Sequence, residues 1–371
     1  IRMADDWHTL ADPDEIPSPA LLVYPERIGE NIRRMIAALG QAERLRPHVK
    51  THKMAEVVQL QLKAGITKFK CATIAEAEML GQAGAKDVLL ANQPVGPNID
   101  RLLGLGGWFR DVRFSTIADD AKTVGNMAQA AQAAGITLPV WLDLDGGMGR
   151  TGIAPGQGAA TLYKLIGQLP GVEPAGLHLY GGHLHDSDPA KRLAKWQMMM
   201  VEVRSFRTGL EAAGLPVPGV VGGGTPTFPF HAQHTDHECS PGTTLLWDFG
   251  YRDAFPDLEY QNAAVLLTRV ISKPGSDCIT LDLGHKAVAA ENPHPRVQFT
   301  GLDNAEPVVH SEEHLTLRTA EARRFNVGDC LYGIPRHICP TVALYDRAHV
   351  IRGGKLTDRW QVAARARKLT F

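Results

Sequence analysis

A lysine in a polar stretch is the first residue of this sequence that could do covalent chemistry. Lys50 follows a short apolar run and lies inside the stretch RPHVKTHK, residues 46–53. If that run is a strand of a parallel barrel, Lys50 lies at its carboxyl end, where such barrels carry their active sites. A partly desolvated lysine near other cations can form an imine with a carbonyl group. A solvated lysine at a strand end is the alternative.

Three consecutive glycines form a second candidate site. Gly222, Gly223 and Gly224 end an apolar run and are followed by Thr225. Glycines let backbone N–H groups converge on an anion, and the loops after the last two strands of a barrel often bind phosphate. The sequence therefore predicts a phosphate cradle at this loop, with an ordinary glycine-rich turn as the alternative.

A histidine and a cysteine two residues apart could bind a metal ion. His337 and Cys339 lie in the stretch RHICP, residues 336–340. In an extended segment, residues i and i+2 point to the same side, so both side chains could reach one ion. Imidazole and thiolate together favour zinc, and two or three protein ligands plus water leave an open, catalytic coordination sphere. The same spacing also arises by chance.

Two further groups of histidines have to be considered. A rival metal candidate lies in a loop flanked by Pro and Gly and consists of His231, His234, His237 and Cys239. An irregular loop does not align such ligands, so we expect a polar loop near the cavity instead. A second group follows another apolar run and consists of His178, Tyr180, His183 and His185. We expect one or two of these residues to line the mouth of the barrel.

Short apolar runs alternate with longer segments of helical period, and these elements would position the candidate residues. Eight runs are found, at residues 19–24, 45–50, 69–72, 88–91, 112–115, 140–143, 176–180 and 219–222. A strand–helix unit repeated eight times predicts a closed parallel (β/α)8 barrel. A Rossmann-type sheet needs fewer strands, and no glycine-rich fingerprint follows the first run.

The pattern changes near residue 240. β-rich runs such as 262–271 and 278–283 are separated by Gly, Pro, Asn and Asp, and long amphipathic helices disappear. The sequence thus predicts an α/β protein with a barrel over residues 20–240. A β-domain would be formed by residues 1–19 and 241–371 and would carry the metal motif.

Composition and charge limit the classes of function. Of the 371 residues, 44% are apolar, and 39 Lys and Arg against 40 Asp and Glu give a net charge of −1. This balance provides no basic field for nucleic acid. The long uncharged stretches 123–142 and 212–235 contain amide side chains or prolines, which argues against a membrane span. Five scattered cysteines favour a reducing cytoplasm, and residues 1–6 contain no apolar signal core.

Six motifs together resemble the D-threonine aldolase and D-serine dehydratase family, pyridoxal phosphate (PLP) enzymes with the alanine-racemase-like fold. The motifs are PSPAL at 17–21, RPHVKTHK at 46–53, DGGMGRTG at 145–152, GGGTPT at 222–227, LDLGHK at 281–286 and HICPTV at 337–342. The lysine motif, the glycine motif and the His-x-Cys-Pro-Thr motif, in this order along the chain, carry most of the specificity.

The resemblance implies a role for each candidate residue. Lys50 would form the Schiff base with PLP, and Gly222, Gly223, Gly224 and Thr225 would hold the phosphate. Arg150 and Tyr180 match positions close to the cofactor ring. His337 and Cys339 would bind a divalent metal, with zinc favoured and manganese or magnesium possible, so that Lys50 and His337 are the catalytic residues. The family also implies a homodimer in which the β-domain of one subunit completes the site of the other.

The resemblance further implies a lyase for small D-β-hydroxy-α-amino acids, and two reactions remain open. Removal of the hydroxyl proton would cleave the Cα–Cβ bond to glycine and an aldehyde, as in a D-threonine aldolase. Removal of the α-proton by Lys50 would expel water, as in a D-serine or D-threo-3-hydroxyaspartate dehydratase. Cys339 resembles the dehydratases, whereas HSEEH at 310–314 and LDLGHK resemble the aldolases, which we favour. A non-catalytic PLP-binding protein is a further alternative, against which residues 241–371 argue.

Overall fold

The computed structural model describes residues 7–371 and divides into two compact units. One unit contains residues 33–50, 55–242 and 366–371. The other contains the described residues up to Ile32, residues 51–54 and residues 243–365. The expectation that no signal core is present concerns residues 1–6, which lie outside the described residues.

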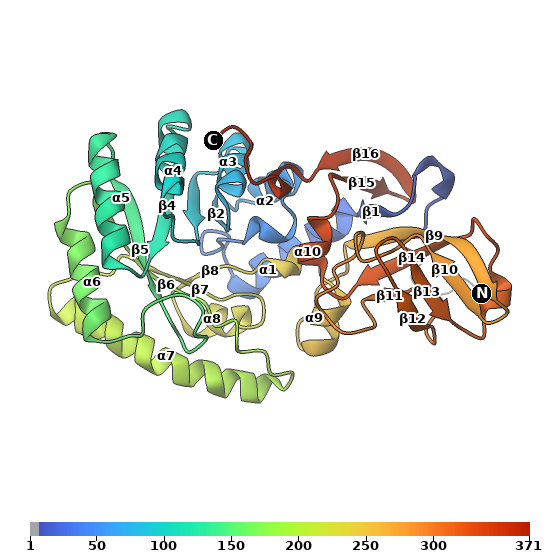
Figure 1. The fold of residues 1–371 in the computed structure, drawn as a ribbon. Helices are drawn as coiled ribbons and strands as arrows, with labels where there is room; N and C mark the ends of the chain where they lie inside the picture. The colour runs from blue at the N-terminus through green and yellow to red at the C-terminus, as the bar shows by residue number, and fades with distance from the viewer. Residues whose placement is uncertain (1–6) are drawn as a thin grey trace. The chain divides into compact units, whose positions relative to one another are not determined.

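Parallel strands form the core of the first unit (Figure 1). Seven are hydrogen-bonded in chain order: β2 (Lys68–Cys71), β3 (Asp87–Leu90), β4 (Arg113–Ala118), β5 (Leu138–Leu144), β6 (Val172–Leu179), β7 (Val220–Gly222) and β8 (Glu238–Cys239). They are buried over most of their length, as expected for parallel strands covered by helices. One core cluster collects a residue from each of five successive strands: Leu89, Ile117, Trp141, Ala175 and Val221.

Residues 44–48 close this sheet into a barrel. Leu45 forms a parallel bridge with Cys239 of β8, and His48 forms one with Lys70 of β2. The N–H of Arg46 donates to the carbonyl of Cys239 at 2.8 Å, and the N–H of Lys70 donates to that of Pro47 at 2.9 Å. The predicted alanine-racemase-like architecture, a parallel barrel with a β-domain, is confirmed.

The predicted set of barrel strands is wrong at one position and incomplete at another. The run 19–24 contains β1 (Ala20–Val23), which pairs with β9 and β15 of the other unit. Strand β8 was not predicted, because its two residues are too short to show a periodicity. Lys50 therefore follows the first barrel segment, His178 lies in the sixth barrel strand, and the glycine loop follows the seventh.

Helices alternate with the barrel strands (Figure 1). They are α2 (Ala55–Lys63), α3 (Ile74–Ala83), α4 (Pro97–Trp108), α5 (Ala121–Ala133), α6 (Gln157–Gln168), α7 (Pro189–Ala212) and α8 (Phe228–His234). The side chains of Thr73, Asp120 and Asp188 cap α3, α5 and α7 by accepting N–H groups of the first turn. Helix α1 (Pro25–Leu39) contributes residues to both units.

A mostly antiparallel sheet forms the second unit. Its main path runs β12-β13-β10-β9-β1-β15-β16, and β14 pairs with β9 and β11. Besides β1, the strands are β9 (Ala264–Gly275), β10 (Cys278–Leu281), β11 (Val297–Phe299), β12 (Glu306–His310), β13 (Leu315–Arg318), β14 (Cys330–Pro335), β15 (Arg347–Arg352) and β16 (Lys355–Gln361). After residue 242 the described α-helices are short, α9 (Phe249–Ala254) and α10 (Ile338–Val342), as the change in pattern predicted.

Strand β1 belongs to this sheet because of its side chains. Ala20 and Leu22 pack in one buried cluster with Val265, Leu267 and Ile351 of the neighbouring strands. Relative to the predicted ranges, residues 20–32 therefore group with the β-rich unit, and residues 366–371 group with the barrel. Among the described residues, no helix combines the length and the apolar character needed to cross a bilayer.

Candidate active site

Lys50 lies in a short 3-10 helix, Val49–Thr51, directly after the closing segment of the barrel. Its backbone N–H donates to Nδ1 of His48 at 3.2 Å, which holds this turn. Its Nζ lies 5.8 Å from the ring centre of Tyr180, and Cζ of Arg150 lies 4.9 Å from the same ring. The barrel thus brings two of the predicted residues, Lys50 and Arg150, close to the ring of a third, Tyr180.

The predicted glycine loop packs against the same tyrosine. A Cβ at Gly224 would lie 2.8 Å from Cε2 of Tyr180, and a Cβ at Gly222 would lie 2.8 Å from Cε1 of His231. Gly223 has a φ of +67°, a conformation that favours glycine. The three glycines therefore allow a close approach of backbone and side chains that no larger residue permits.

Two hydroxyl groups lie at this loop. The N–H of Ser240 donates to the carbonyl of Gly222 at 3.0 Å, and Oγ of Ser240 is buried without a hydrogen-bond partner. Oγ1 of Thr225 accepts from the N–H of Gly242 at 3.2 Å. A buried hydroxyl without a partner beside a glycine loop fits a bound phosphate, which would satisfy it. The residues present therefore fit the phosphate group of PLP.

A buried histidine and a buried aspartate come from adjacent strands of the barrel. Asp143 of β5 and His178 of β6 are register partners, and Nδ1 of His178 lies 2.6 Å from Oδ1 of Asp143. Burial raises the pKa of Asp143, but the interactions with His178, the hydrogen bond with Thr151 and the charge of Lys70 together bring it below its usual value. Burial and the charge of Lys70 lower the pKa of His178. Neutral His178 therefore donates from Nδ1, and its buried Nε2 is an acceptor without a partner.

His337 and Cys339 lie at the start of α10, in the β-rich unit. Burial lowers the pKa of His337, but its hydrogen bond with Cys339, the charge of that residue and the bond to Glu291 raise it to about 9. Burial raises the pKa of the Cys339 thiol, but the interactions with His337 and the hydrogen bond with Thr51 together bring it below its usual value. Sγ of Cys339 lies 3.1 Å from Oγ1 of Thr51, the residue that follows Lys50.

The donor set of this pair fits a metal ion with an open coordination sphere. Nδ1 of His337 lies 2.5 Å from Oε1 of Glu291, and a carboxylate on one ring nitrogen is the usual support of a metal-binding histidine. Among the described residues, no group of three or more His, Cys, Asp and Glu is arranged to hold a metal. Water and substrate would have to supply the remaining ligands.

The rival metal candidate is not assembled in the part of the chain that the structure describes. Nδ1 of His231 lies 3.1 Å from Nδ1 of His237, and Sγ of Cys239 instead donates to the carbonyl of His237 at 3.6 Å. Burial lowers the pKa of His231 well below its usual value and that of His237 to about 4. These are buried histidines that share a hydrogen bond.

Of the histidines expected at the barrel mouth, His178 and His183 contribute buried ring nitrogens. Nδ1 of His183, like Nε2 of His178, is buried and has no hydrogen-bond partner. A Cβ at Gly147, in the loop after β5, would lie 3.5 Å from Nε2 of His183. This loop also contains Arg150, whose neighbours Gly147 and Gly149 donate their N–H groups to Oδ1 of Asp145.

Sequence reasoning did not single out several residues that the fold brings to these positions. They are Thr51, Lys70, Asp143, Ser240 and Glu291. Asp143 could have been found, because it ends an apolar run two residues before a motif named above. Ser240 and Glu291 carry no local signal, since each is placed by a partner distant in sequence.

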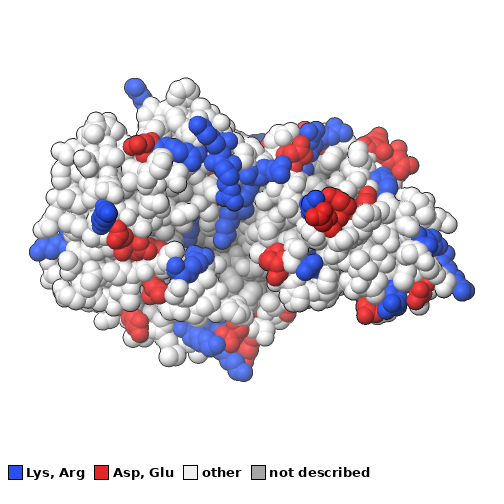
Figure 2. Space-filling model, viewed as in Figure 1, with Lys and Arg blue, Asp and Glu red and all other residues white. Residues whose placement is uncertain are grey.

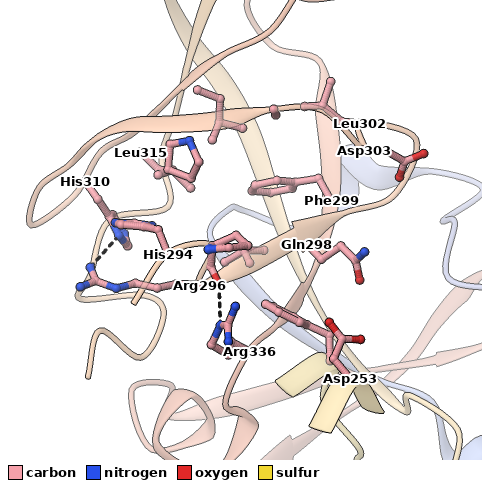
Figure 3. Close-up of a pocket in the computed structure, with 16 residues that line it drawn as sticks. Asp253, His294, Arg296, Gln298, Phe299, Leu302, Asp303, His310, Leu315 and Arg336 are labelled. Atoms are coloured by element: carbon pink, nitrogen blue, oxygen red, sulfur yellow. Dashed lines mark hydrogen bonds between the residues drawn. The ribbon is translucent and has the colours of Figure 1, made fainter. Parts of the chain in front are cut away.

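A separate pocket of about 330 Å³ lies in the β-rich unit (Figure 3). Arg296, Arg336, His294 and His310 are among its lining residues, and Nη1 of Arg296 donates to Nδ1 of His310 at 3.0 Å. Figure 3 also shows the bond from Nε of Arg336 to the carbonyl of Pro295, 2.8 Å long. None of the residues predicted for the active site lines this pocket.

Charged side chains of both signs are scattered over the face shown in Figure 2, with wide uncharged areas between them. This distribution agrees with the net charge of −1.

Family models match both parts of the chain. "Alanine racemase, N-terminal domain" matches residues 23–248, more than half of the sequence. The chain belongs to this family. "Putative serine dehydratase domain" matches residues 263–351. The two matches together confirm the family predicted from the motifs, and they support PLP as the cofactor.

Relatives with assigned activities align over nearly the whole chain. A D-threonine aldolase from Arthrobacter sp. is 29% identical, with 94% of this chain and 93% of the relative covered. A 3-hydroxy-D-aspartate aldolase from Paracoccus denitrificans is also 29% identical, with 96% and 94% covered. A D-threo-3-hydroxyaspartate dehydratase from Delftia sp. is 26% identical, with 93% and 97% covered.

A solved structure confirms the fold over both units. The D-threonine aldolase from Filomicrobium marinum matches with a TM-score of 0.89 at 26% identity, covering 95% of this chain and 96% of the other. The comparisons thus confirm the prediction of an enzyme of the lyase type. Aldolases and a dehydratase both occur among the relatives, so both predicted reactions are represented.

Proposed function

We propose that this chain is a PLP- and divalent-metal-dependent lyase for D-β-hydroxy-α-amino acids, and that its reaction is the retro-aldol cleavage of a D-threonine aldolase. The observation that carries the proposal is the grouping of Lys50, Arg150 and Tyr180 beside the glycine loop. The aldolase relatives, aligned over nearly the whole chain, support the choice of reaction.

Each group of PLP has a counterpart among the residues of the barrel. PLP, when bound, supplies an electron sink that weakens the bonds at the substrate α-carbon. Lys50 would hold the carbonyl carbon of PLP through Nζ and would be available as a base once the substrate amine is bound. The N–H groups of residues 222–225 and Oγ of Ser240 would hold the phosphate. Arg150 and Tyr180 would lie close to the ring.

The metal would be held by His337 and Cys339. The thiolate favours zinc, with manganese or magnesium as alternatives. A divalent ion there would act as a Lewis acid on the β-hydroxyl of the substrate. Glu291 keeps the ring of His337 in place through Nδ1.

The position from which a proton is removed decides between the two reactions. Removal of the β-hydroxyl proton leads to cleavage of the Cα–Cβ bond and releases glycine and an aldehyde. Removal of the α-proton by Lys50 leads to loss of water and then of ammonia. The dehydratase is the second candidate, and the observation in its favour is the thiol ligand Cys339 together with the Delftia relative.

A homodimer in a reducing cytoplasm completes the proposal, with a small D-amino acid as substrate and no nucleic-acid or membrane partner. Light scattering at micromolar concentration tests the dimer. We expect a dimer, and a monomer with full activity would contradict a site shared between subunits.

Product analysis with D-threonine tests the reaction. We expect acetaldehyde and glycine in equal amounts. Ammonia and 2-oxobutanoate without glycine would show the dehydratase instead, and D-serine would then give pyruvate. Comparable turnover of L-threonine would contradict the stereochemistry of the proposal, because only one configuration at the α-carbon directs the hydroxyl toward the metal.

Two further measurements test the cofactor and the metal separately. Borohydride reduction followed by peptide mapping should place the PLP label on Lys50; a label on Lys53 would refute the assignment of the lysine. Chelation should abolish turnover and leave the yellow colour, and His337→Ala should behave like the chelated enzyme. Full activity after complete removal of metal would refute both the aldolase and the dehydratase as proposed.

A further inference from the structure

Lys70 is a buried cation without a hydrogen bond or a close ion pair among the described residues. Only 5% of the residue is exposed, and among the described residues its Nζ has neither a hydrogen-bond partner nor a carboxylate within 4.0 Å. An unpaired charge inside a protein is costly, so such groups either lose the charge or meet an anion. The proposed function assigns no role to Lys70, so the burial of its charge needs a separate explanation.

The same face of β2 carries a lysine that is paired. Lys68 and Lys70 are two residues apart on one strand, so their side chains lie on the same face. Lys68 pairs with Glu238, and Arg46 pairs with Glu238 and with Asp87, both of the Arg46 pairs at 2.6 Å. Glu238 and Asp87 are therefore already engaged. Asp143 accepts a hydrogen bond from His178, so Lys70 forms no ion pair within 4.0 Å among the described residues.

Lys70 is next to Lys50 in the barrel order. The closing segment that leads to Lys50 has β8 on one side and β2 on the other, through the bridges Leu45–Cys239 and His48–Lys70. Ser240 and the glycine loop lie on the β8 side. Burial, followed by the charge of Lys50, lowers the pKa of Lys70 to about 7; Asp143 opposes this effect, and Arg46 and Arg150 add to it.

We propose that Lys70 is a second cationic group of the cofactor site, whose ammonium binds the phenolate oxygen of PLP. This inference rests on the proposed function, in which Lys50 holds PLP. The carbonyl of PLP is attached to a ring carbon with two substituted neighbours, one bearing the phosphate arm and the other the phenolate oxygen. With the phosphate on the β8 side of Lys50, the phenolate oxygen lies on the β2 side, where Lys70 stands.

The partners already assigned to the other charges support this choice. Asp143, the carboxylate whose charge acts on Lys70, is engaged with His178, and Asp87 and Glu238 are engaged with Arg46, so we expect the anion for Lys70 to come from the ligand. The phenolate oxygen is the anionic oxygen of PLP closest to the carbon that Lys50 holds. Bound there, it would restore the charge of Lys70 and remove the cost of its burial.

The test compares PLP with its 3-O-methyl analogue, which lacks the phenolate charge, on the wild type, Lys70→Met and Lys68→Met. In the wild type we expect PLP to bind roughly tenfold to a hundredfold more tightly than the analogue, the range for a hydrogen bond to a charged group. Lys70→Met should lose this preference, and Lys68→Met, the matched control, should keep it. Lys70→Gln serves in the same way if the methionine variant does not fold.

The visible absorbance of bound PLP, measured as a function of pH, provides a second test. A cation beside the phenolate favours the more negative state of the bound cofactor, so the pH transition of its visible absorbance should move to higher pH in Lys70→Met. Equal preference for PLP in Lys70→Met and wild type, or an unchanged transition, would overturn the proposal. Normal PLP binding with weakened D-threonine binding would also overturn it, because Lys70 would then serve the substrate carboxylate. If the proposed function itself is wrong, borohydride will not label Lys50, which distinguishes that outcome from a failure of the Lys70 proposal.

Discussion

Each of the two units contains a histidine whose Nδ1 is held by a carboxylate, and the two pairs behave differently. His178 and Asp143 are joined at 2.6 Å in the barrel, with side chains 4% exposed. His337 and Glu291 are joined at 2.5 Å in the β-rich unit, with side chains 37% and 48% exposed. The pKa of His178 is lowered by burial and Lys70, whereas that of His337 is raised to about 9.

The comparison shows that a carboxylate partner alone does not set the charge of a histidine, because the other groups around the ring decide it. Between adjacent barrel strands the imidazole is cut off from water and close to a cation, so the neutral form is favoured. At the start of α10 the neighbouring thiol and carboxylate favour the charged form. The first environment suits a fixed acceptor inside a cofactor site, and the second suits a ligand that exchanges its proton for a metal ion.

The largest effect is expected from the residue at the centre of the barrel site. Lys50→Ala should reduce turnover of D-threonine by about a thousandfold or more, because both the covalent hold on PLP and the base are lost. The thermal unfolding temperature should change little, since the side chain is only partly buried. Lys53→Ala is the matched control, and a comparable loss of turnover there would contradict the assignment.

Removal of the buried carboxylate of Asp143 tests its hydrogen bond with His178. Asp143→Ala leaves the N–H of His178 without an acceptor and should cost about 2–3 kcal/mol in the free energy of unfolding, measured with urea. Asp143→Asn keeps an acceptor and should cost less. Equal costs for the two variants would show that lost packing, rather than the hydrogen bond, is responsible.

A stability measurement without PLP tests the charge of Lys70. Its folded pKa of about 7 lies below the unfolded value of 10.5, so the unfolded chain binds more protons between these limits. With respect to Lys70, the free energy of unfolding is therefore highest above pH 10.5, where the lysine is neutral in both states. It falls as the pH decreases toward 7 and is lowest below pH 7. Lys70→Met should therefore stabilise the apo-protein at pH 6 by about 1–4 kcal/mol and stabilise it less at pH 9. If Lys70→Met stabilises the protein equally at both pH values, the charge of Lys70 is not the cause.

The smallest effect on stability is expected for the partly exposed pair of His337 and Glu291. Glu291→Gln should change the free energy of unfolding by less than about 1 kcal/mol, because water already screens this contact. The affinity for zinc, measured by competition with a chelator, should nevertheless fall roughly tenfold to a hundredfold, as for other carboxylates that support a metal-bound histidine. An unchanged affinity would separate Glu291 from the metal site.

The sequence alone was sufficient where a short stretch of chain carries the information. The motifs around Lys50, Gly222 and His337 led to the family, the enzyme class and the alanine-racemase-like fold, which the comparisons confirm. They could do so because each motif's residues are adjacent in the chain. The change from helical to β-rich pattern near residue 240 is likewise local.

Tertiary structure decided whatever depends on partners distant in sequence. The run 19–24 has the pattern of a buried strand, but only its pairing with β9 and β15 places it outside the barrel. Strand β8 exists because β7 and residues 44–48 hold it on both sides. Lys70 lies in the predicted strand 69–72, but its place beside the segment that leads to Lys50 follows only from the closure of the barrel. Pairing and burial are set by the whole chain at once, which is why no local pattern could predict them.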